Sequence, residues 1–190
     1  LLPSAHSHGQ RHCTTRTTVK EAEMTTTQAK PQATHDSFTI ERRYRSAPAK
    51  VFEAFADPAI KRRWYVEGPG FIVGSYTPDF RVGGKETSAF TVDAGDFKSD
   101  EIRNDTYYFD IVDQRRIVYG YSMSNVGVPF SASLATVLFE ENDEGGTTLT
   151  FHEHVTFLEG SDGVKMREAG TRQLLERLAE ELGEESVPVD

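Results

Sequence analysis

Residues 162–183 read DGVKMREAGTRQLLERLAEELG, and this is the stretch that decides the fold. Apolar side chains recur there at helical spacing, which predicts an amphipathic helix with the buried stripe Val164, Leu174, Leu175, Leu178 and Leu182. The opposite face is charged and is expected to face water: Arg172, Glu176, Arg177, Glu180, Glu181 and Glu184. Asp162 is a candidate N-cap, and Gly183 is a helix-stop signal. No other stretch predicts a helix of this length.

Upstream of this helix the chain shows strand patterns separated by turn residues. Strands are expected near residues 76–82, 85–93, 106–112, 116–124, 130–141 and 147–158. The Gly83-Gly84 pair predicts a hairpin turn between the first two. The connections leave no room for a crossover helix, so the sheet must be antiparallel. Another strand comes earlier, where Phe38, Ile40 and Tyr44 alternate with polar residues.

Two short helices are expected between that first strand and the rest of the sheet. Pro48 suits the first turn of one helix, in which Val51 and Phe55 share a face. Asp57 and Pro58 provide the N-cap and first position of the next helix. The order of elements is therefore strand, helix, helix, six strands and one long helix.

This order predicts an α+β fold in which a curved, seven-stranded antiparallel sheet closes around the long C-terminal helix. Each sheet face that is apolar must be buried against another layer, and only one long helix exists to cover it. One helix cannot fill the concave side of seven strands, so an internal cavity is expected. This arrangement is the helix-grip fold.

The chain has 190 residues, and one domain is expected at residues 37–185. Residues 1–36 contain scattered apolar residues without periodicity, which predicts a disordered tail. Met24 is a candidate native start, so residues 1–23 are candidates for non-native sequence. Residues 186–190 are expected to fray.

Composition and charge exclude several classes of protein. The sequence has no apolar run near the roughly 18 residues that a membrane helix needs. The single cysteine, Cys13, fits a reducing compartment, and we expect a cytoplasmic protein. Residues 1–35 carry a net charge of +2 and the remainder −11, within a total of −9. So acidic a domain repels nucleic-acid phosphates and anionic lipid, and we expect it to bind neither nucleic acid nor membranes.

Several short segments, taken in order, resemble the START/Bet v 1-like (SRPBCC) superfamily. Within it they resemble the bacterial branch related to the C-terminal domain of the Hsp90 ATPase activator Aha1. The matching segments are IERRY (40–44), AP (47–48), VF (51–52), DP (57–58), Trp64, DFRVGG (79–84), RIVY (116–119), GTTLT (146–150) and REAG (167–170). The resemblance covers residues 37–183 and implies the helix-grip fold with a ligand cavity, but no particular reaction.

Glu153 is the most informative candidate for chemistry. It falls on the inward face of the last expected strand, together with Leu149, Phe151, Val155 and Phe157. Arg42 similarly interrupts the apolar face of the first strand. Because the first and last strands are neighbours in the helix-grip order, Arg42 and Glu153 are expected to pair across the sheet. Such a pair either fixes the strand register or offers a polar hook to a ligand carboxylate or carbonyl group.

His152 and His154 share the opposite face of the same strand. Two histidines can bind a metal, but a stable site needs a third ligand, and the sequence offers no obvious one. We therefore interpret them as exposed side chains and expect no metal and no cofactor.

The expected cavity lining is mostly aromatic. Besides Arg42 and Glu153, the candidate ligand-binding residues are Trp64, Arg81, Tyr107, Phe109, Tyr119, Tyr121, Phe151, Met166 and Gly170. The hydroxyl groups of Tyr119 and Tyr121 could orient a polar group of a ligand. Arg81 is expected either at the cavity rim or in a turn.

Three functions are compatible with this sequence. The first is binding of a small hydrophobic or amphipathic molecule without catalysis. The second is a cyclase-like or hydratase-like enzyme that uses Glu153 as acid and base, which requires Glu153 to be open to the cavity near Tyr119 or Tyr121. The third is a co-chaperone-like module with a filled core and an exposed apolar patch, although we do not expect Hsp90 itself as a partner. The sequence also allows a homodimer.

Overall fold

The computed structural model describes residues 32–94, 97–161, 163–185 and 187–188. The predicted tail over residues 1–31 and the candidate N-cap Asp162 lie outside the described residues. In the part of the chain that the structure describes, no helix is both long and apolar enough to cross a membrane.

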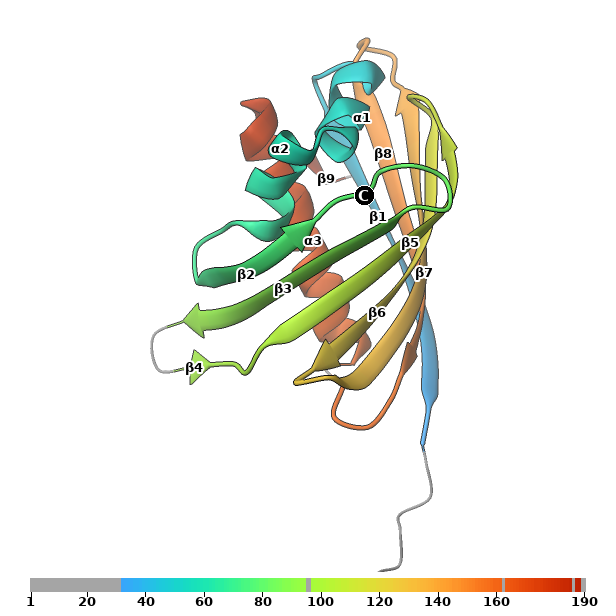
Figure 1. The fold of residues 1–190 in the computed structure, drawn as a ribbon. Helices are drawn as coiled ribbons and strands as arrows, with labels where there is room; N and C mark the ends of the chain where they lie inside the picture. The colour runs from blue at the N-terminus through green and yellow to red at the C-terminus, as the bar shows by residue number, and fades with distance from the viewer. Residues whose placement is uncertain (1–31, 95–96, 162, 186, 189–190) are drawn as a thin grey trace, which may run out of the picture. The chain divides into compact units, whose positions relative to one another are not determined.

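The helices and long strands follow one another along the chain in the expected order (Figure 1). The elements are β1 (Thr34–Tyr44), α1 (Pro48–Ala56), α2 (Pro58–Lys61), the π-helical turn η1 (Arg62–Val66), β2 (Phe71–Thr77), β3 (Lys85–Ala94), β4 (Phe97–Lys98), β5 (Ile102–Val112), β6 (Arg116–Asn125), β7 (Val128–Glu141), β8 (Thr147–Phe157), α3 (Val164–Leu182) and β9 (Val187–Pro188). The seven long strands and the C-terminal helix confirm the α+β helix-grip prediction. Strands β4 and β9 are two-residue additions.

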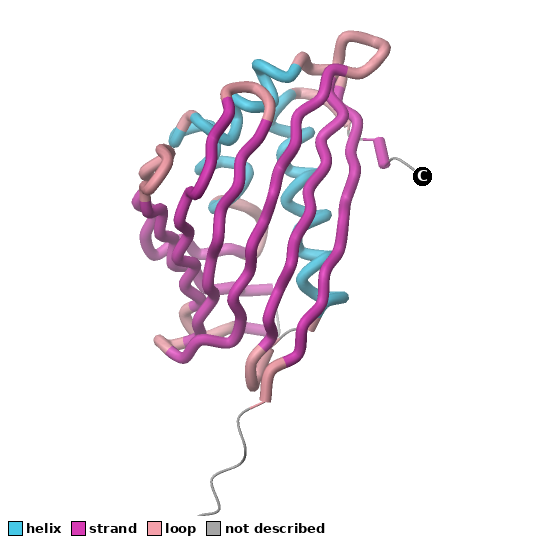
Figure 2. The backbone as a smooth tube through the Cα atoms, turned by 90° about the vertical axis from the view of Figure 1, so that its right-hand side faces the viewer, coloured by secondary structure: helices cyan, strands magenta, loops and turns pink. Residues whose placement is uncertain are grey.

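The sheet has the strand order β2-β3-β5-β6-β7-β8-β1-β9, with β4 beside β3, and its pairs are antiparallel. Figure 2 shows the long strands as one broad sheet with the helices on one side of it. Strands β1 and β8 are neighbours, as expected, so the chain returns to its first strand before it enters α3.

The boundary between α1 and α2 follows from local chemistry. The Asp57 side chain accepts hydrogen bonds from the backbone N–H groups of Ala59 and Ile60, and Pro58 is the first helical residue. These bonds satisfy donors that a helix start otherwise leaves unpaired. The predicted N-cap is therefore confirmed.

The predicted Gly83-Gly84 hairpin is wrong in its strand boundary. Strand β2 ends at Thr77, so the connection to β3 is the longer loop of residues 78–84. That loop packs the ring of Phe80 edge-on against both Phe52 and Tyr108. Burying Phe80 needs a longer connection than a two-residue turn provides. Gly84 is required here, because a Cβ atom would lie 2.1 Å from the Asp79 carbonyl oxygen.

Both chain ends of the domain take part in the sheet. Strand β1 begins at Thr34, within the segment predicted to be a tail that extends to residue 36. Residues 187–188, predicted to fray, pair with Arg42 and Arg43 of β1. Residues 186, 189 and 190 lie outside the described residues.

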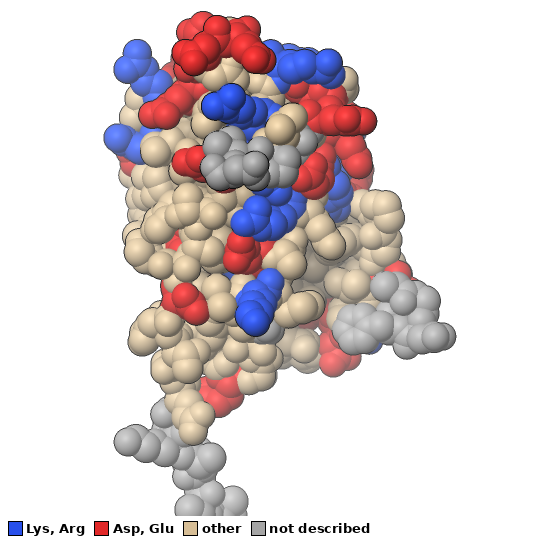
Figure 3. Space-filling model, turned by 180° about the vertical axis from the view of Figure 1, so that it is seen from behind, with Lys and Arg blue, Asp and Glu red and all other residues tan. Residues whose placement is uncertain are grey.

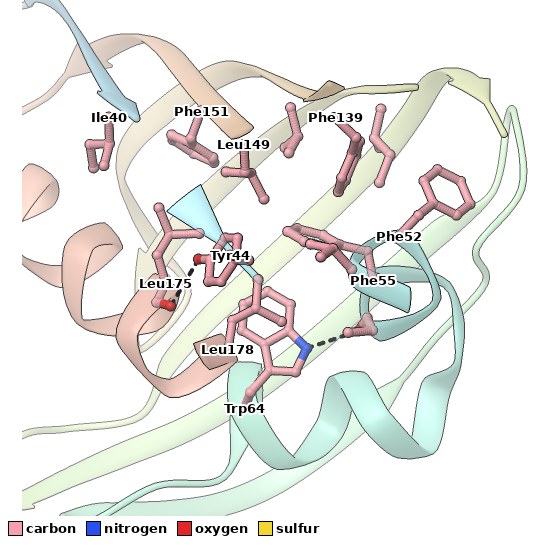
Figure 4. Close-up of a cluster of buried hydrophobic side chains, with 14 of the residues drawn as sticks. Ile40, Tyr44, Phe52, Phe55, Trp64, Phe139, Leu149, Phe151, Leu175 and Leu178 are labelled. Atoms are coloured by element: carbon pink, nitrogen blue, oxygen red, sulfur yellow. Dashed lines mark hydrogen bonds between the residues drawn. The ribbon is translucent and has the colours of Figure 1, made fainter. Parts of the chain in front are cut away.

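Buried aromatic and aliphatic side chains fill one end of the space between sheet and helices (Figure 4). Two hydrogen bonds anchor this cluster: the Tyr44 hydroxyl donates to the Leu175 carbonyl oxygen at 3.0 Å, and the Trp64 indole donates to the Ala54 carbonyl oxygen at 2.8 Å. Both polar groups are thereby satisfied inside the core. This packing holds α3 against β1.

The outer surface is strongly charged. On the face opposite to that of Figure 1, basic side chains lie among acidic ones (Figure 3). Exposed ion pairs such as Arg62–Glu67 and Arg116–Asp110 belong to this kind of surface. Each contributes at most about 1 kcal/mol, so the fold depends mainly on its interior.

Candidate ligand-binding cavity

A cavity of about 260 Å³ lies between η1, α3 and the strands β2, β3, β5 and β6, with Phe151 of β8 also in its wall. Aromatic and aliphatic side chains supply most of its lining. The volume is close to the lower end of the range of about 300–1,000 Å³ for small-molecule sites. The cavity therefore suits a small, largely apolar ligand.

Six of the predicted residues line this cavity: Trp64, Tyr119, Tyr121, Phe151, Met166 and Gly170. They come from η1, β6, β8 and α3. Met166 and Gly170 lie on the exposed side of the wall, in the first half of α3. These two residues therefore belong to the mouth of the cavity.

The prediction for Tyr107 and Phe109 is wrong, because both side chains point outward and are 46% and 58% exposed. The neighbouring Tyr108 is the inward residue of β5, and it lines the cavity. The strand alternates regularly up to Tyr108, so Tyr107 and Phe109 do share one face, but that face is the outer one. The register shift between Tyr108 and Asp110 changes the phase only beyond this point, where Ile111 packs against the core. The Phe109 ring lies over Gly120 on the outer face, where a Cβ atom on Gly120 would lie 2.8 Å from Phe109 Cε2.

Arg81 lies in the turn and not at the rim. Its guanidinium bonds Asp79 at 2.9 Å, and the residue is not part of the cavity lining. Of the two expected positions, the structure places Arg81 in the turn.

The predicted pair of Arg42 and Glu153 across the sheet is wrong, because the two side chains do not meet. In the register of β1 and β8, Glu153 lies opposite Phe38, and Arg42 lies opposite Leu149. Four residues of strand separate the two positions, or about 13 Å. Arg42 is buried as predicted, but its guanidinium bonds Glu176 of α3 at 3.2 Å. Neither Arg42 nor Glu153 is a cavity-lining residue.

Glu153 pairs instead with Arg167 from α3, at 3.4 Å from Nη1 to Oε1. The same Oε1 accepts hydrogen bonds from the hydroxyls of Tyr121 and Ser133, both at 2.7 Å. Arg167 also donates to Ser131 Oγ at 2.8 Å. Glu153 is completely buried, and among the described residues its Oε2 has no hydrogen-bond partner. Tyr121 and Arg167 line the cavity and separate Glu153 from it.

Burial raises the pKa of Glu153 above its ordinary value, while the bonds from Tyr121, Ser133 and Arg167 oppose that rise. Desolvation is the largest cause, because a carboxylate loses its hydration when it is enclosed. The bonds of this cluster go to Oε1, so among the described residues Glu153 Oε2 is enclosed without a hydrogen-bond partner.

A second buried cluster, not expected from the sequence, lies in the cavity wall. Lys61 Nζ contacts both oxygens of Glu86, at 2.7 and 2.8 Å, and the hydroxyl of Tyr108 at 2.7 Å. The Tyr108 hydroxyl in turn donates to Glu86 Oε2 at 2.9 Å. The sequence contained a signal: Glu86 alternates in phase with Phe90 of β3, and Lys61 precedes Trp64 by three residues, one helical turn.

The lining tyrosines remain hydrogen-bond donors at neutral pH. Burial, with the nearby Glu86 and Glu153 carboxyls as further causes, raises the pKa of Tyr119 well above its ordinary value. Burial likewise raises the pKa of Tyr121. Within the described residues the Tyr119 hydroxyl makes no hydrogen bond. A hydroxyl in a cavity wall that has no protein partner is available to a ligand.

His152 and His154 lie on the outer face of β8. Their Nε2 atoms are 2.9 Å apart, and His152 Nδ1 is 2.6 Å from the Thr39 hydroxyl. In the chain as described, no group of three or more histidine, cysteine or acidic side chains gathers to hold a metal ion.

Comparison with known proteins places the chain in a family. The model of the family described as "Activator of Hsp90 ATPase homolog 1-like protein" matches residues 45–183. The chain belongs to this family. No curated protein sequence matches it.

Two solved structures of bacterial proteins are similar to this chain over most of its length. A protein from Rhizobium loti shares 46% identity, with 79% of this chain and 99% of that chain covered and a TM-score of 0.70. A protein from Rhizobium leguminosarum shares 35% identity, with 81% and 98% covered and a TM-score of 0.71. A protein from the dynemicin biosynthetic locus, at 21% identity, 78% and 47% coverage and a TM-score of 0.55, shares the fold alone.

Proposed function

We propose that this protein binds a small hydrophobic or amphipathic molecule in the cavity between η1, α3 and the sheet. The observation that carries the proposal is a mostly apolar cavity in whose wall, among the described residues, the hydroxyl of Tyr119 has no hydrogen-bond partner. Apolar lining supplies affinity through burial, and a few polar groups supply orientation. The ligand would place its apolar body against the aromatic wall and a hydrogen-bond acceptor at Tyr119.

The ion pairs of the wall support binding more than catalysis. Lys61 and Glu86 are satisfied by each other and by Tyr108, so they close the wall without offering a reactive group. Glu153 is fully buried behind Tyr121 and does not line the cavity. An acid–base residue must come within hydrogen-bond reach of its substrate, so we do not assign this role to Glu153.

A neutral fluorescent dye whose emission depends on solvent polarity tests the proposal. Its emission is expected to rise and shift to shorter wavelength as the protein is added, and small apolar competitors should reverse the change. Native mass spectrometry of the same mixture should show one dye per chain. An unchanged emission spectrum at saturating protein would contradict the proposal.

Substitutions at Gly170 locate the binding within the molecule. Gly170 lines the cavity at its exposed edge in α3, and a Cβ atom there would meet nothing within 4 Å. Gly170→Ala is expected to stabilise the protein by about 0.8–1 kcal/mol, because alanine is the better helix former, and to keep dye affinity. Gly170→Trp should retain the fold but narrow the mouth and weaken dye binding at least tenfold. Urea unfolding and dye titration measure both effects.

The alanine variant is the matched control for that experiment. If Gly170→Trp bound the dye as tightly as Gly170→Ala did, the dye would occupy a different surface and the assignment of the cavity would be wrong.

A further inference from the structure

Four charged side chains line the cavity: Lys61, Glu86, Arg167 and Arg177. Three of them have an ionic partner in the structure: Lys61 and Glu86 pair with each other, and Arg167 pairs with Glu153. Arg177 differs. Among the described residues, no carboxylate lies within ion-pair distance of its guanidinium. Our sequence-based expectation that Arg177 faces water is also wrong, because the residue is half-buried.

The contacts of Arg177 leave most of its donors unused. Nη1 donates to the Glu67 carbonyl oxygen at 2.8 Å, and the guanidinium carbon lies 5.0 Å from the centre of the Phe71 ring, which also lines the cavity. A guanidinium carries five N–H donors, so one backbone bond leaves the others to solvent or to a ligand. Partial burial also lowers the pKa of Arg177, which shows that its charge is poorly solvated where it lies.

The backbone beside this guanidinium is shaped to accommodate it. A Cβ atom on Gly68 would lie 1.9 Å from Arg177 Nη1, so any side chain at position 68 would displace the guanidinium. Gly68 lies in the connection between η1 and β2, and its lack of a side chain leaves room for the guanidinium between this backbone and Phe71. Arg177 is thus held at one edge of an apolar cavity rather than extended into solvent.

We propose that Arg177 binds the carboxylate group of the ligand, which makes the ligand a small amphipathic carboxylic acid. This inference rests on the proposed function. The planar fork of a guanidinium matches the two oxygens of a carboxylate, and such charge-assisted bonds are stronger than neutral ones. The apolar part of the ligand would lie in the cavity beyond Phe71. The domain is strongly acidic, so attraction of an anion must come from a local group such as this arginine.

The test compares three ligands that share one apolar body: phenylhexanoate, its methyl ester and the corresponding primary alcohol. Each displaces the neutral dye from the wild-type protein at a pH where the acid is ionised. The carboxylate is expected to bind at least tenfold more tightly than the ester or the alcohol. In Arg177→Gln the carboxylate should bind about ten- to a hundredfold more weakly, as for the loss of hydrogen bonds to a charged group, while the ester changes less than about twofold.

Arg172→Gln is the matched control, because Arg172 lies on the same helix and pairs with Glu168 outside the cavity lining. It should leave all three affinities unchanged. Arg177→Lys keeps the charge but not the fork, and an intermediate carboxylate affinity is expected. Circular dichroism verifies that each variant is folded.

The outcomes separate the two proposals. Equal displacement by carboxylate and ester, or a carboxylate affinity unaffected by Arg177→Gln, would overturn the role of Arg177 and leave the binding function intact. Failure of the dye and of all three ligands to bind the wild-type protein would overturn the proposed function and this inference with it.

Discussion

Lys61→Met is expected to lower the free energy of unfolding by about 3–5 kcal/mol, which is typical of breaking a buried ion pair by removing one partner. The Glu86 carboxylate would remain enclosed without its cation, and only hydroxyl groups would be left to bond it: Tyr108 at 2.9 Å and Tyr76 at 3.4 Å. Methionine keeps much of the length of the lysine stem, so little packing is lost. Urea unfolding of both proteins measures the difference.

The double variant Lys61→Met/Glu86→Gln is the control for this interpretation. The amide oxygen of glutamine can still accept from Tyr108, and no net charge stays buried, so most of the lost stability should return. A double variant as unstable as the single one would mean that packing, and not the uncompensated carboxylate, accounts for the loss.

Arg167→Met is expected to produce a loss of stability that depends on pH. Burial raises the pKa of Glu153 above its ordinary value of 4.5, so the folded protein holds this proton to higher pH than the unfolded chain does. Stability contributed by this group is therefore present below about pH 4.5 and falls as pH rises through the raised pKa. Without Arg167 the pKa of Glu153 should rise further, so the fall should be larger and should extend to higher pH.

The loss on Arg167→Met should thus be smallest in acid, where Glu153 is protonated in both proteins. It should reach about 3–5 kcal/mol at alkaline pH, where the carboxylate is ionised and has lost its cation. A part that does not depend on pH reflects the bond from Arg167 to Ser131. Urea unfolding at a series of pH values measures both parts.

Glu153→Gln provides the reference for this series. In that background no carboxyl titrates at position 153. Arg167→Met should therefore lower the free energy of unfolding by the same amount at every pH. A loss that varied with pH equally in both backgrounds would assign the effect to another group and contradict the role given to Glu153.

Local patterns predicted two strands of the sheet, β1 and β8, well. Alternation along β1 and β8 identified the buried faces that carry Arg42 and Glu153, and the Asp57-Pro58 pair identified the start of α2. These features depend on residues close in sequence. The period of two along a strand separates its two faces wherever the strand is regular, and on β1 and β8 the apolar residues mark the inner one.

The same reasoning failed on β5, because alternation separates the two faces of a strand without showing which of them is the inner one. Tyr107 and Phe109 share a face, as alternation predicts, but Tyr108 is the inward residue, so the aromatic stripe expected to line the cavity faces outward. Nothing in the local pattern separates the two tyrosines. Tyr108 is inward because its hydroxyl completes the bonds of Lys61 and Glu86, which come from other elements.

By itself, the sequence determined the order of elements, the antiparallel sheet, the single long helix and hence the need for a cavity, because each follows from periodicity and from apolar faces that must be buried. Only the tertiary structure decided which charges meet. The way α3 crosses the sheet brings Arg167 to Glu153 and Glu176 to Arg42, and it leaves Arg177 beside Phe71 and Gly68. Such pairings depend on the distance between elements that are far apart in the chain, and no local pattern encodes that distance.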